Sequence, residues 1–167
     1  MIKKCIFFVL LLPGCLLSLL LHNDAMGFTR EQLETFGANI EFIVQATPRY
    51  VWGGSSSIER GLDCSGAIYL AAKWAGMPVT RTTSLRMSAG LDGWVGNDII
   101  DANARARLDL MFWTLKDHRP NGHVGVLLDR DHVAHASSTQ GHATISPLEG
   151  VLREKLTAIR RLLGAEQ

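Results

Sequence analysis

The most informative part of this sequence is Tyr50-Val51-Trp52-Gly53-Gly54, followed closely by Asp63-Cys64-Ser65-Gly66. A loop rich in Gly and Ser over residues 53–57 leads toward an apolar, helix-forming segment over residues 66–74. Gly and Pro after residue 75 end that helix, and the residues on either side of Cys64 are types that favour a helix start. The sequence therefore places Cys64 where a loop enters a helix.

The surroundings of Cys64 suit a nucleophile. A thiol attacks only as the thiolate, and the free backbone N–H groups in the first turn of a helix favour that negative charge. The same N–H groups can stabilise the oxyanion that forms when a carbonyl is attacked. Asp63 and Ser65 are interpreted first as capping residues. A lone Cys without such neighbours would more often be a small buried apolar residue.

A nucleophilic thiol needs a base, and His123 and His135 are the best candidates. His123 begins the apolar run over residues 123–128, and His135 lies among small residues in the run over residues 133–136. Two antiparallel strands joined by a tight turn near residues 129–131 would bring the two imidazoles side by side. One ring can then orient the other, as in a nucleophile–base–orienter triad, although each alone has a structural explanation. The remaining histidines after residue 26 fall in predicted turns and are interpreted as solvated surface residues: His118, His132 and His142.

The chain after residue 26 predicts an α+β fold. Thr29 and Gln32 form a capping-box pattern, and apolar residues at helical spacing then continue to about Ala46. Residues 80–107 are mixed and rich in turn-forming residues. Two helices are then followed by an antiparallel meander, which differs from the alternating order of a parallel-sheet fold. The predicted strands cover residues 110–115, 124–128, 133–136 and 143–146, and residues 157–163 form a last strand or a short helix.

The N-terminus is interpreted as an export signal. Two lysines precede an almost unbroken apolar run over residues 5–21, the order typical of a secretory signal. The run is long for a signal core and slightly short for a spanning helix, so cleavage after Ala25 and retention as an inner-membrane anchor both stay open. A faint lipoprotein box before Cys15 is discounted because the apolar run continues beyond it. We expect residues 26–167 to form one domain that works in the periplasm or cell envelope.

Composition excludes several classes of protein. The chain has 167 residues and a formal net charge of +1, so no bulk charge favours nucleic acid as a partner. Of its three cysteines, only Cys64 lies beyond the N-terminal apolar run. The domain therefore has neither a disulfide framework of its own nor a site that needs two thiolates. We expect no metal and no organic cofactor.

The two motifs around Cys64 resemble the paired signature of the NlpC/P60 cysteine peptidases. Further segments follow in the order of that family, and the similarity spans about residues 35–162. The combination is specific, although each segment alone is weak. These segments resemble the stretch after the catalytic helix, the first core strand, the strand of the catalytic His and the strand of the third residue: residues 81–84, 108–113, 123–126 and 133–137.

The resemblance implies a papain-like α+β core in which N-terminal helices pack on an antiparallel sheet. It implies a peptidoglycan hydrolase, an endopeptidase that cleaves γ-D-glutamyl–diamino acid bonds in stem peptides. It implies Cys64 as nucleophile, His123 as base and His135 as orienter.

The resemblance also implies a substrate site. Tyr50 matches a Tyr that lines the family's site near the oxyanion position. Asp63 and Ser65 match positions that help to hold the free amine of the stem peptide, although capping explains Ser65 at least as well. Arg81 either meets a substrate carboxylate or braces its own loop. Trp52 is interpreted as a packing residue.

Three segments depart from the family pattern. Ala106-Arg107 stands where the family usually has a Pro-Gly turn, and residues 116–121 form a polar insertion. Residues 89–101, which include Trp94, do not align and form either a specificity loop or a lid. These departures concern the segments that would select the substrate and leave the predicted catalytic residues unchanged.

Two other functions stay open. One is an amidase of the same superfamily, which product masses would distinguish. The other is an inactive wall-binding module or assembly adaptor, which an unreactive thiol would favour. Circularly permuted acyltransferase relatives place the His before the Cys, which is not the order here. Wall remodelling, passage of a larger machine through the wall and a toxin role all stay possible, and no added wall-binding module is visible.

Overall fold

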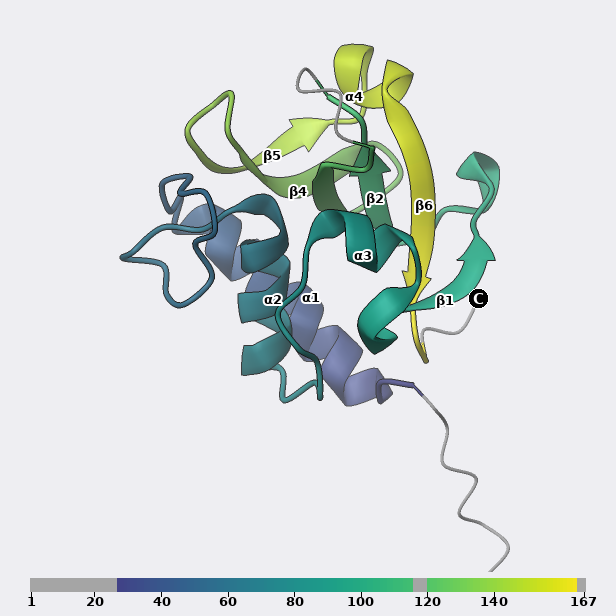
Figure 1. The fold of residues 1–167 in the computed structure, drawn as a ribbon, viewed down its shortest axis with the longest axis horizontal. Coiled ribbons are helices and arrows are strands. Elements are labelled where there is room, and N and C mark those ends of the chain that lie inside the picture. Colours follow the sequence, from purple (N-terminus) through teal and green to yellow (C-terminus); the bar gives the residue numbers. More distant parts are fainter. Residues whose placement is uncertain (1–26, 116–119, 165–167) are drawn as a thin grey trace, which may run out of the picture.

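Helices packed on a six-stranded antiparallel sheet form the fold in the computed structural model, which describes residues 27–115 and 120–164 (Figure 1). The predicted export signal and His118 lie outside these residues. Within them, no helix combines the length and apolar character that a membrane span needs. The elements in chain order are α1 (Arg30–Gln45), α2 (Cys64–Trp74), α3 (Ser84–Ser88), β1 (Val95–Ile99), β2 (Leu110–Trp113), β3 (His123–Leu127), β4 (His132–Ser137), β5 (His142–Pro147), α4 (Gly150–Glu154) and β6 (Leu156–Leu162).

The two long helices begin as the sequence predicts. Thr29 and Gln32 form the capping box of α1, each side chain accepting a hydrogen bond from the backbone N–H of the other. Asp63 caps α2 by accepting a hydrogen bond from the N–H of Gly66 at 2.6 Å. Helix α2 therefore starts at Cys64, the position predicted for the nucleophile.

The sheet is more complex than the predicted meander. Its strand order is β1-β6-β2-β3-β4-β5, and every neighbouring pair is antiparallel. Strands β2 to β5 follow one another as predicted, and residues 129–131 form the tight turn between β3 and β4. The last segment is a strand, not a helix, and it returns to pair with β2. Strand β1 extends the sheet beyond it.

The turn-rich region at residues 80–107 contains structure that the sequence does not predict. It holds α3 and the edge strand β1, whose sequence Val-Gly-Asn-Asp-Ile lacks any alternation of apolar and polar residues. Pairing with β6, and not local propensity, therefore specifies β1. Trp94 is fully buried, and its Nε1 donates to the carbonyl of Thr80 at 3.2 Å. This part of the unaligned segment is core and sheet edge, so the lid interpretation is wrong for it.

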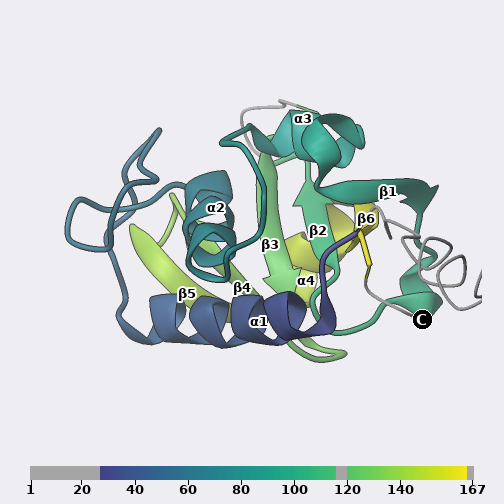
Figure 2. The same cartoon turned by 90° about the horizontal axis from the view of Figure 1, so that it is seen from below.

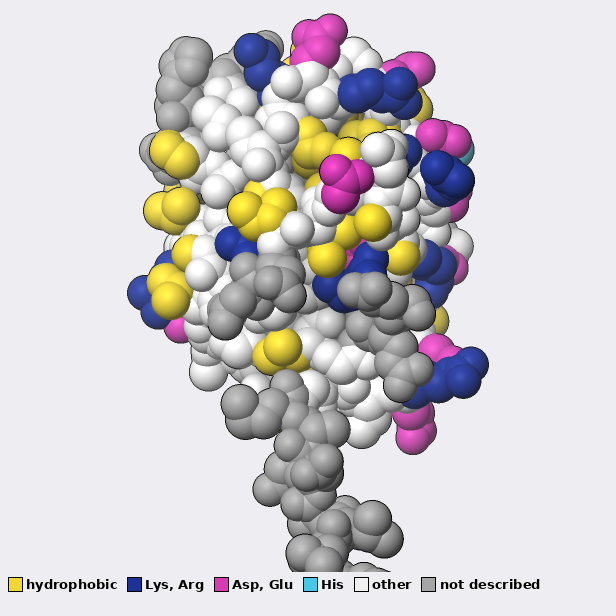
Figure 3. All heavy atoms as spheres, turned by 90° about the vertical axis from the view of Figure 1, so that its right-hand side faces the viewer, with side chains coloured by type: hydrophobic (Ala, Val, Ile, Leu, Met, Phe, Trp, Pro, Cys, Tyr) yellow, Lys and Arg dark blue, Asp and Glu magenta, His cyan; other side chains and the backbone are white. Residues whose placement is uncertain are grey.

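Apolar clusters cover both faces of the sheet. Helices α1 and α2 lie on one face, as two views of the ribbon show (Figures 1 and 2). The alternation along β2 sends Leu110 and Phe112 to the cluster on the helix side, and Met111 and Trp113 to the second cluster. On the side of the molecule seen in Figure 3, hydrophobic side chains form small groups between charged ones.

The turn before β2 replaces the Pro-Gly turn of the resemblance. Asp109 is buried, and its carboxylate accepts the N–H of Ala106 at 2.7 Å. The same carboxylate accepts two hydrogen bonds from the guanidinium of Arg161, at 2.9 and 3.0 Å. Leu108 takes a positive φ of 71°, which a side chain rarely adopts. A buried ion pair between Asp109 and Arg161 therefore stabilises this turn, which has neither the proline nor the glycine of the family pattern.

Gly66 sits at the closest backbone approach in the loop that leads into α2. A Cβ at this position would lie 1.9 Å from the carbonyl oxygen of Gly54. That oxygen also accepts the N–H of Asp63 at 2.9 Å, so it cannot move without breaking the helix entry.

We expect Gly66→Ala to destabilise the fold by about 3 kcal/mol or more, because backbone and not a flexible side chain must give way. The measurement is urea unfolding of the purified protein. Gly96→Ala is the matched control, since a Cβ at Gly96 meets nothing within 4 Å. Equal stability of the two variants would contradict the packing described here.

Candidate active site

Cys64 lies at the tip of α2, beside the start of the strand that carries His123. The backbone N–H groups of Val124 and Ser65 act on the sulfur as hydrogen-bond donors that lower the thiol pKa. The ladder between β3 and β4 pairs Val126 with Ala134 and Leu127 with Val133. It stops short of Val124, so the helix tip meets β3 where β4 no longer pairs with it.

The two predicted imidazoles lie together. His123 Nε2 and His135 Nδ1 are 2.8 Å apart, and the rings meet edge to face with centroids 5.0 Å apart. Both residues are buried, and the fully buried indole of Trp113 lies against them at centroid distances of 5.5 and 6.5 Å. The predicted hairpin therefore produces the predicted pair of side chains.

Gly125 allows this pair to form. It lies between Val124 and Val126 on β3, and a Cβ there would come within 3.1 Å of the His135 Cβ and 2.7 Å of a Val133 methyl group. Only a residue without a side chain leaves room for β4 to carry His135 this close.

The remaining nitrogen of His123 is available for chemistry. Its Nδ1 has no hydrogen-bond partner among the residues that the structure describes. Every fully buried side-chain nitrogen or oxygen in that part of the chain has a hydrogen-bond partner. Because Nδ1 has none, it is not fully buried and is accessible to solvent. No hydrogen bond joins the Cys64 thiol to either ring within residues 27–115 and 120–164. The sulfur is near the histidine strand, but a thiol–imidazole bond is not formed.

The electrostatics of Cys64 differ from the prediction of a stabilised thiolate. Burial, and then the neighbouring charge of Asp63, raise the thiol pKa from 9.0 to about 11. The N–H groups of Val124 and Ser65 and the charge of Arg81 lower it, but by less. The expectation from the helix tip was wrong because it omitted desolvation and an acidic neighbour.

Both imidazoles are held neutral. Burial, and then the nearby charge of His135, lower the pKa of His123 from 6.5 to about 3. Burial lowers the pKa of His135 from 6.5 to about 4. At neutral pH the site therefore holds a protonated thiol and two uncharged rings.

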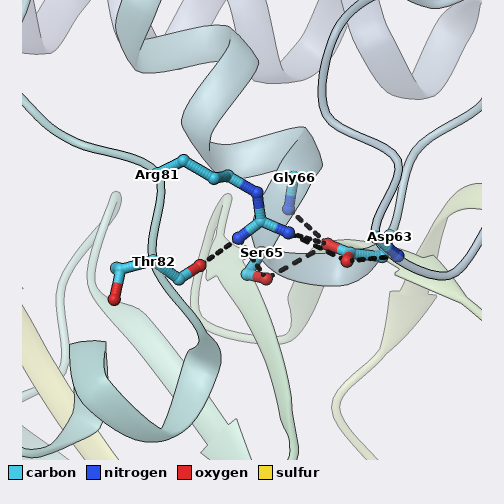
Figure 4. Close-up of polar contacts among 6 residues, drawn as sticks. Asp63, Ser65, Gly66, Arg81 and Thr82 are labelled. Carbon is cyan, nitrogen blue, oxygen red and sulfur yellow. Dashed lines mark hydrogen bonds and ion pairs between the residues drawn. The ribbon is translucent and has the colours of Figure 1, made fainter.

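Asp63, Ser65 and Arg81 form one network at the start of α2 (Figure 4). Arg81 Nη2 donates to both carboxylate oxygens of Asp63 at 2.9 Å, and Nη1 donates to Ser65 Oγ at 2.9 Å and to the Thr82 carbonyl. Asp63 also accepts the N–H of Gly53 at 2.9 Å. Of the two interpretations of Arg81, the described contacts correspond to the bracing one.

A cavity of about 760 Å³ opens beside His123. Tyr50 and Trp52 line it from the loop before α2, and α4 and the start of β6 line it on another side. Trp52 is 69 % exposed, so its prediction as a packing residue is wrong. Cys64 is not among the lining residues, which are Tyr50, Trp52, Thr114, Leu115, Gly122, His123, Ser138, Thr139, Val151, Glu154, Lys155, Leu156 and Thr157.

Two residues of the site were not predicted. Ser146 accepts or donates a hydrogen bond at His135 Nε2, at 2.9 Å, and Trp113 stands opposite His123 in the pairing of β2 with β3. Both residues lie in strands that the sequence predicts, but only the strand register shows that they contact the histidine pair. His132 and His142 instead begin β4 and β5 and stay away from the pair. In the described ranges, no cluster of His, Cys, Asp and Glu could hold a metal ion.

Fold and site together define the class of this protein: an α+β domain of papain-like arrangement, with a Cys at a helix tip and paired histidines on an antiparallel sheet. Residues 47–161 match the sequence model of the NlpC/P60 family. The chain belongs to the NlpC/P60 family. No curated protein matches it.

Solved structures share this fold. A Staphylococcus aureus protein, described as similar to a lipoprotein of the NLP/P60 family, matches with a TM-score of 0.63 and 20% identity over 86% of this chain and 45% of its own. The peptidoglycan hydrolase RipB of Mycobacterium tuberculosis gives 0.58 and 21% over 81% and 69%. The NlpC/p60 domain of the peptidoglycan hydrolase SagA gives 0.55 and 25% over 77% and 97%. This chain thus spans less than half of the staphylococcal protein.

The raised pKa of Cys64 predicts slow alkylation at neutral pH. Iodoacetamide reacts with the thiolate, so its rate at Cys64 should rise with pH until about 11. The rate is followed by mass spectrometry of the peptide that contains Cys64, with the same protein in urea as the control. A rate that is already maximal at pH 7 would mean that the site holds a thiolate instead.

The lowered histidine pKa values predict loss of stability in mild acid. The unfolded chain takes up protons below about pH 6.5, whereas the folded rings do so only near 3 and 4. Between pH 7 and 5, the free energy of unfolding should therefore fall by up to about 1.4 kcal/mol per pH unit for each ring. Urea unfolding measures this slope, and His135→Asn should reduce it. An unchanged slope in that variant would show that His135 is charged or solvated.

Proposed function

We propose that this protein is a peptidoglycan hydrolase, a cysteine endopeptidase that cleaves the γ-D-glutamyl–diamino acid bond of stem peptides. The single observation that carries the proposal is the buried His123–His135 hydrogen bond on the strand beside the helix tip that bears Cys64. Membership of the NlpC/P60 family and the similarity to RipB and SagA, both described as peptidoglycan hydrolases, support the same reading.

In the proposed reaction, His123 Nδ1 takes the proton of the Cys64 thiol as the sulfur attacks the substrate carbonyl. A C–S bond forms, and the N–H of Ser65 at the helix tip faces the developing oxyanion. The C–N bond then breaks, and the departing amine takes the proton from His123. Water attacks the resulting thioester with His123 as base, which releases the acid and restores the thiol.

The resting protonation states affect this mechanism. At rest the thiol is protonated and the imidazole is neutral, so the site contains no thiolate–imidazolium ion pair. In the proposed reaction, the proton therefore moves from sulfur to nitrogen while the sulfur attacks, and not before. His135 Nδ1 lies 2.8 Å from His123 Nε2, and its role in the proposal is to accept a hydrogen bond from that nitrogen and so stabilise the imidazolium that forms transiently.

The cavity beside His123 is the proposed seat of the stem peptide. It is large enough for a short peptide, and Tyr50 and His123 both line it. Asp63 is the carboxylate closest to the nucleophile in sequence and the proposed partner of the free amine, with Ser65 beside it. Arg81 holds that carboxylate in place.

We further propose that the protein is exported and acts on the wall from the periplasm or cell envelope, with the N-terminal run as a cleaved signal or an inner-membrane anchor. The apolar run behind two lysines supports export. Peptidoglycan, and not nucleic acid, is the proposed partner.

A wall-binding module without activity is the second candidate. The observation in its favour is the buried thiol, whose pKa is raised and which has no hydrogen bond to a ring among the described residues. A binding module would keep the cavity and lose the chemistry, so activity assays separate the two candidates.

Cys64→Ala should lower hydrolysis of purified peptidoglycan by about 10⁴-fold or more, because no other thiol remains at the site. Mass spectrometry of the released muropeptides identifies the bond, and cleavage between sugar and peptide would mean an amidase. The folded state of the variant is checked by its urea midpoint. Undiminished hydrolysis would exclude Cys64 as nucleophile, and wild-type protein that binds peptidoglycan without releasing fragments would favour the binding module.

His123→Ala should be as inactive as Cys64→Ala, whereas His135→Ala should retain roughly a hundredfold more activity, because an orienter transfers no proton. His132→Ala is the matched control, since its exposed ring at the start of β4 pairs with Asp129 of the preceding turn and not with the histidine pair. The assay is initial release of muropeptides. The opposite ranking would exchange the roles of His123 and His135.

A further inference from the structure

Ser146 extends the histidine pair into a chain of three hydrogen-bonded side chains. It lies on β5, two residues after the one that faces His135, and its side chain shares that face of the sheet. Its Oγ lies 2.9 Å from His135 Nε2, and all three members of the chain are buried. Gln140 Nε2 donates to the same oxygen at 3.4 Å.

Proton counting allows this chain only two arrangements. A neutral imidazole has one N–H, so its two nitrogens must be one donor and one acceptor. In the first arrangement, His123 Nε2–H donates to His135 Nδ1, and His135 Nε2–H donates to Ser146 Oγ. In the second, the Ser146 hydroxyl donates to His135 Nε2, and His135 Nδ1–H donates to His123 Nε2.

The two arrangements differ in what they leave on His123. In the first, His123 Nδ1 has a free lone pair and can take a proton from the thiol. In the second, Nδ1 already holds the proton of the neutral ring, and His123 cannot act as a base. Because both rings are neutral at pH 7, no charged form avoids this choice.

We propose that Ser146 is a positioning residue whose oxygen accepts a hydrogen bond from His135 Nε2–H and thereby holds the histidine pair in the arrangement that leaves His123 Nδ1 free. The inference rests on the proposed function for the role of His123 as base. The contact with Gln140 is compatible with this arrangement, because a hydroxyl oxygen can accept one hydrogen bond from Gln140 and a second from His135. The hydroxyl hydrogen of Ser146 is then directed away from His135.

The first test is the tautomer of His135 in the wild-type protein at pH 7. Long-range ¹H–¹⁵N NMR distinguishes a protonated from an unprotonated ring nitrogen and needs no substrate. We expect His135 to be protonated at Nε2 and bare at Nδ1. The opposite tautomer would overturn the proposal, because Ser146 would then be the donor.

The second test is a series of substitutions at Ser146. Ser146→Ala leaves His135 Nε2–H without an acceptor, so His135 should shift toward the Nδ1–H form. The value of kcat should fall by about ten- to hundredfold, which is the loss that typically follows when a hydrogen-bond partner of a site residue is removed. KM should change little. Ser146→Thr keeps the hydroxyl and should restore both tautomer and kcat. The activity readout is release of muropeptides from purified peptidoglycan.

Ser88→Ala is the matched control. Ser88 is also a buried serine with one hydrogen bond from its Oγ, to the Leu85 carbonyl, but it lies on α3 outside the chain of side chains. It should change neither tautomer nor kcat. Wild-type tautomer and kcat in Ser146→Ala would overturn the proposal. A wild-type protein that shows the expected tautomer but releases no muropeptide would instead count against the proposed function alone.

Discussion

The carboxylate of Asp63 holds together the loop, the helix start and the arginine that surround the nucleophile. It is buried, yet it accepts backbone N–H groups from both sides of the nucleophile, Gly53 and Gly66, together with the Ser65 hydroxyl and the forked guanidinium of Arg81. A buried charge is tolerable only when it is paired in this complete manner. One side chain thus starts α2 and fixes the preceding loop. The same negative charge helps to raise the pKa of the neighbouring Cys64 thiol. The residue that positions the nucleophile therefore also favours its protonated form.

Burial dominates the chemistry of the site. The helix tip and nearby N–H groups favour a thiolate, but removal of water from Cys64 and from both rings outweighs them. The thiol and both imidazoles are therefore uncharged at rest, and the position of their protons decides whether His123 can act as a base. Trp113 contributes to this dryness, because its buried indole closes one side of the His123–His135 pair.

Much of this arrangement could be predicted from the sequence, and the failures have physical causes. Capping residues and periodic apolar residues predicted α1, α2 and strands β2 to β5, and the hairpin spacing predicted the contact of His123 with His135. Strand β1 has no pattern of its own, because pairing with β6 specifies it. Ser146 was missed because strand register, and not residue type, brings it to His135. The prediction of a lowered thiol pKa was wrong because the burial of Cys64, and the desolvation that follows from it, cannot be inferred from its neighbours in sequence.

The exposed indole of Trp52 gives the protein an optical property that follows from its position. Trp94 and Trp113 are fully buried, whereas Trp52 is 69 % exposed on the rim of the cavity beside His123. Trp74, the remaining tryptophan, is 43 % exposed, but it lies on α2 against Phe42 and is not among the residues that line the cavity. Water-soluble quenchers of fluorescence therefore reach Trp52 far more readily than the two core indoles, and anything that fills the cavity shields it. The chain carries its own spectroscopic probe of occupancy.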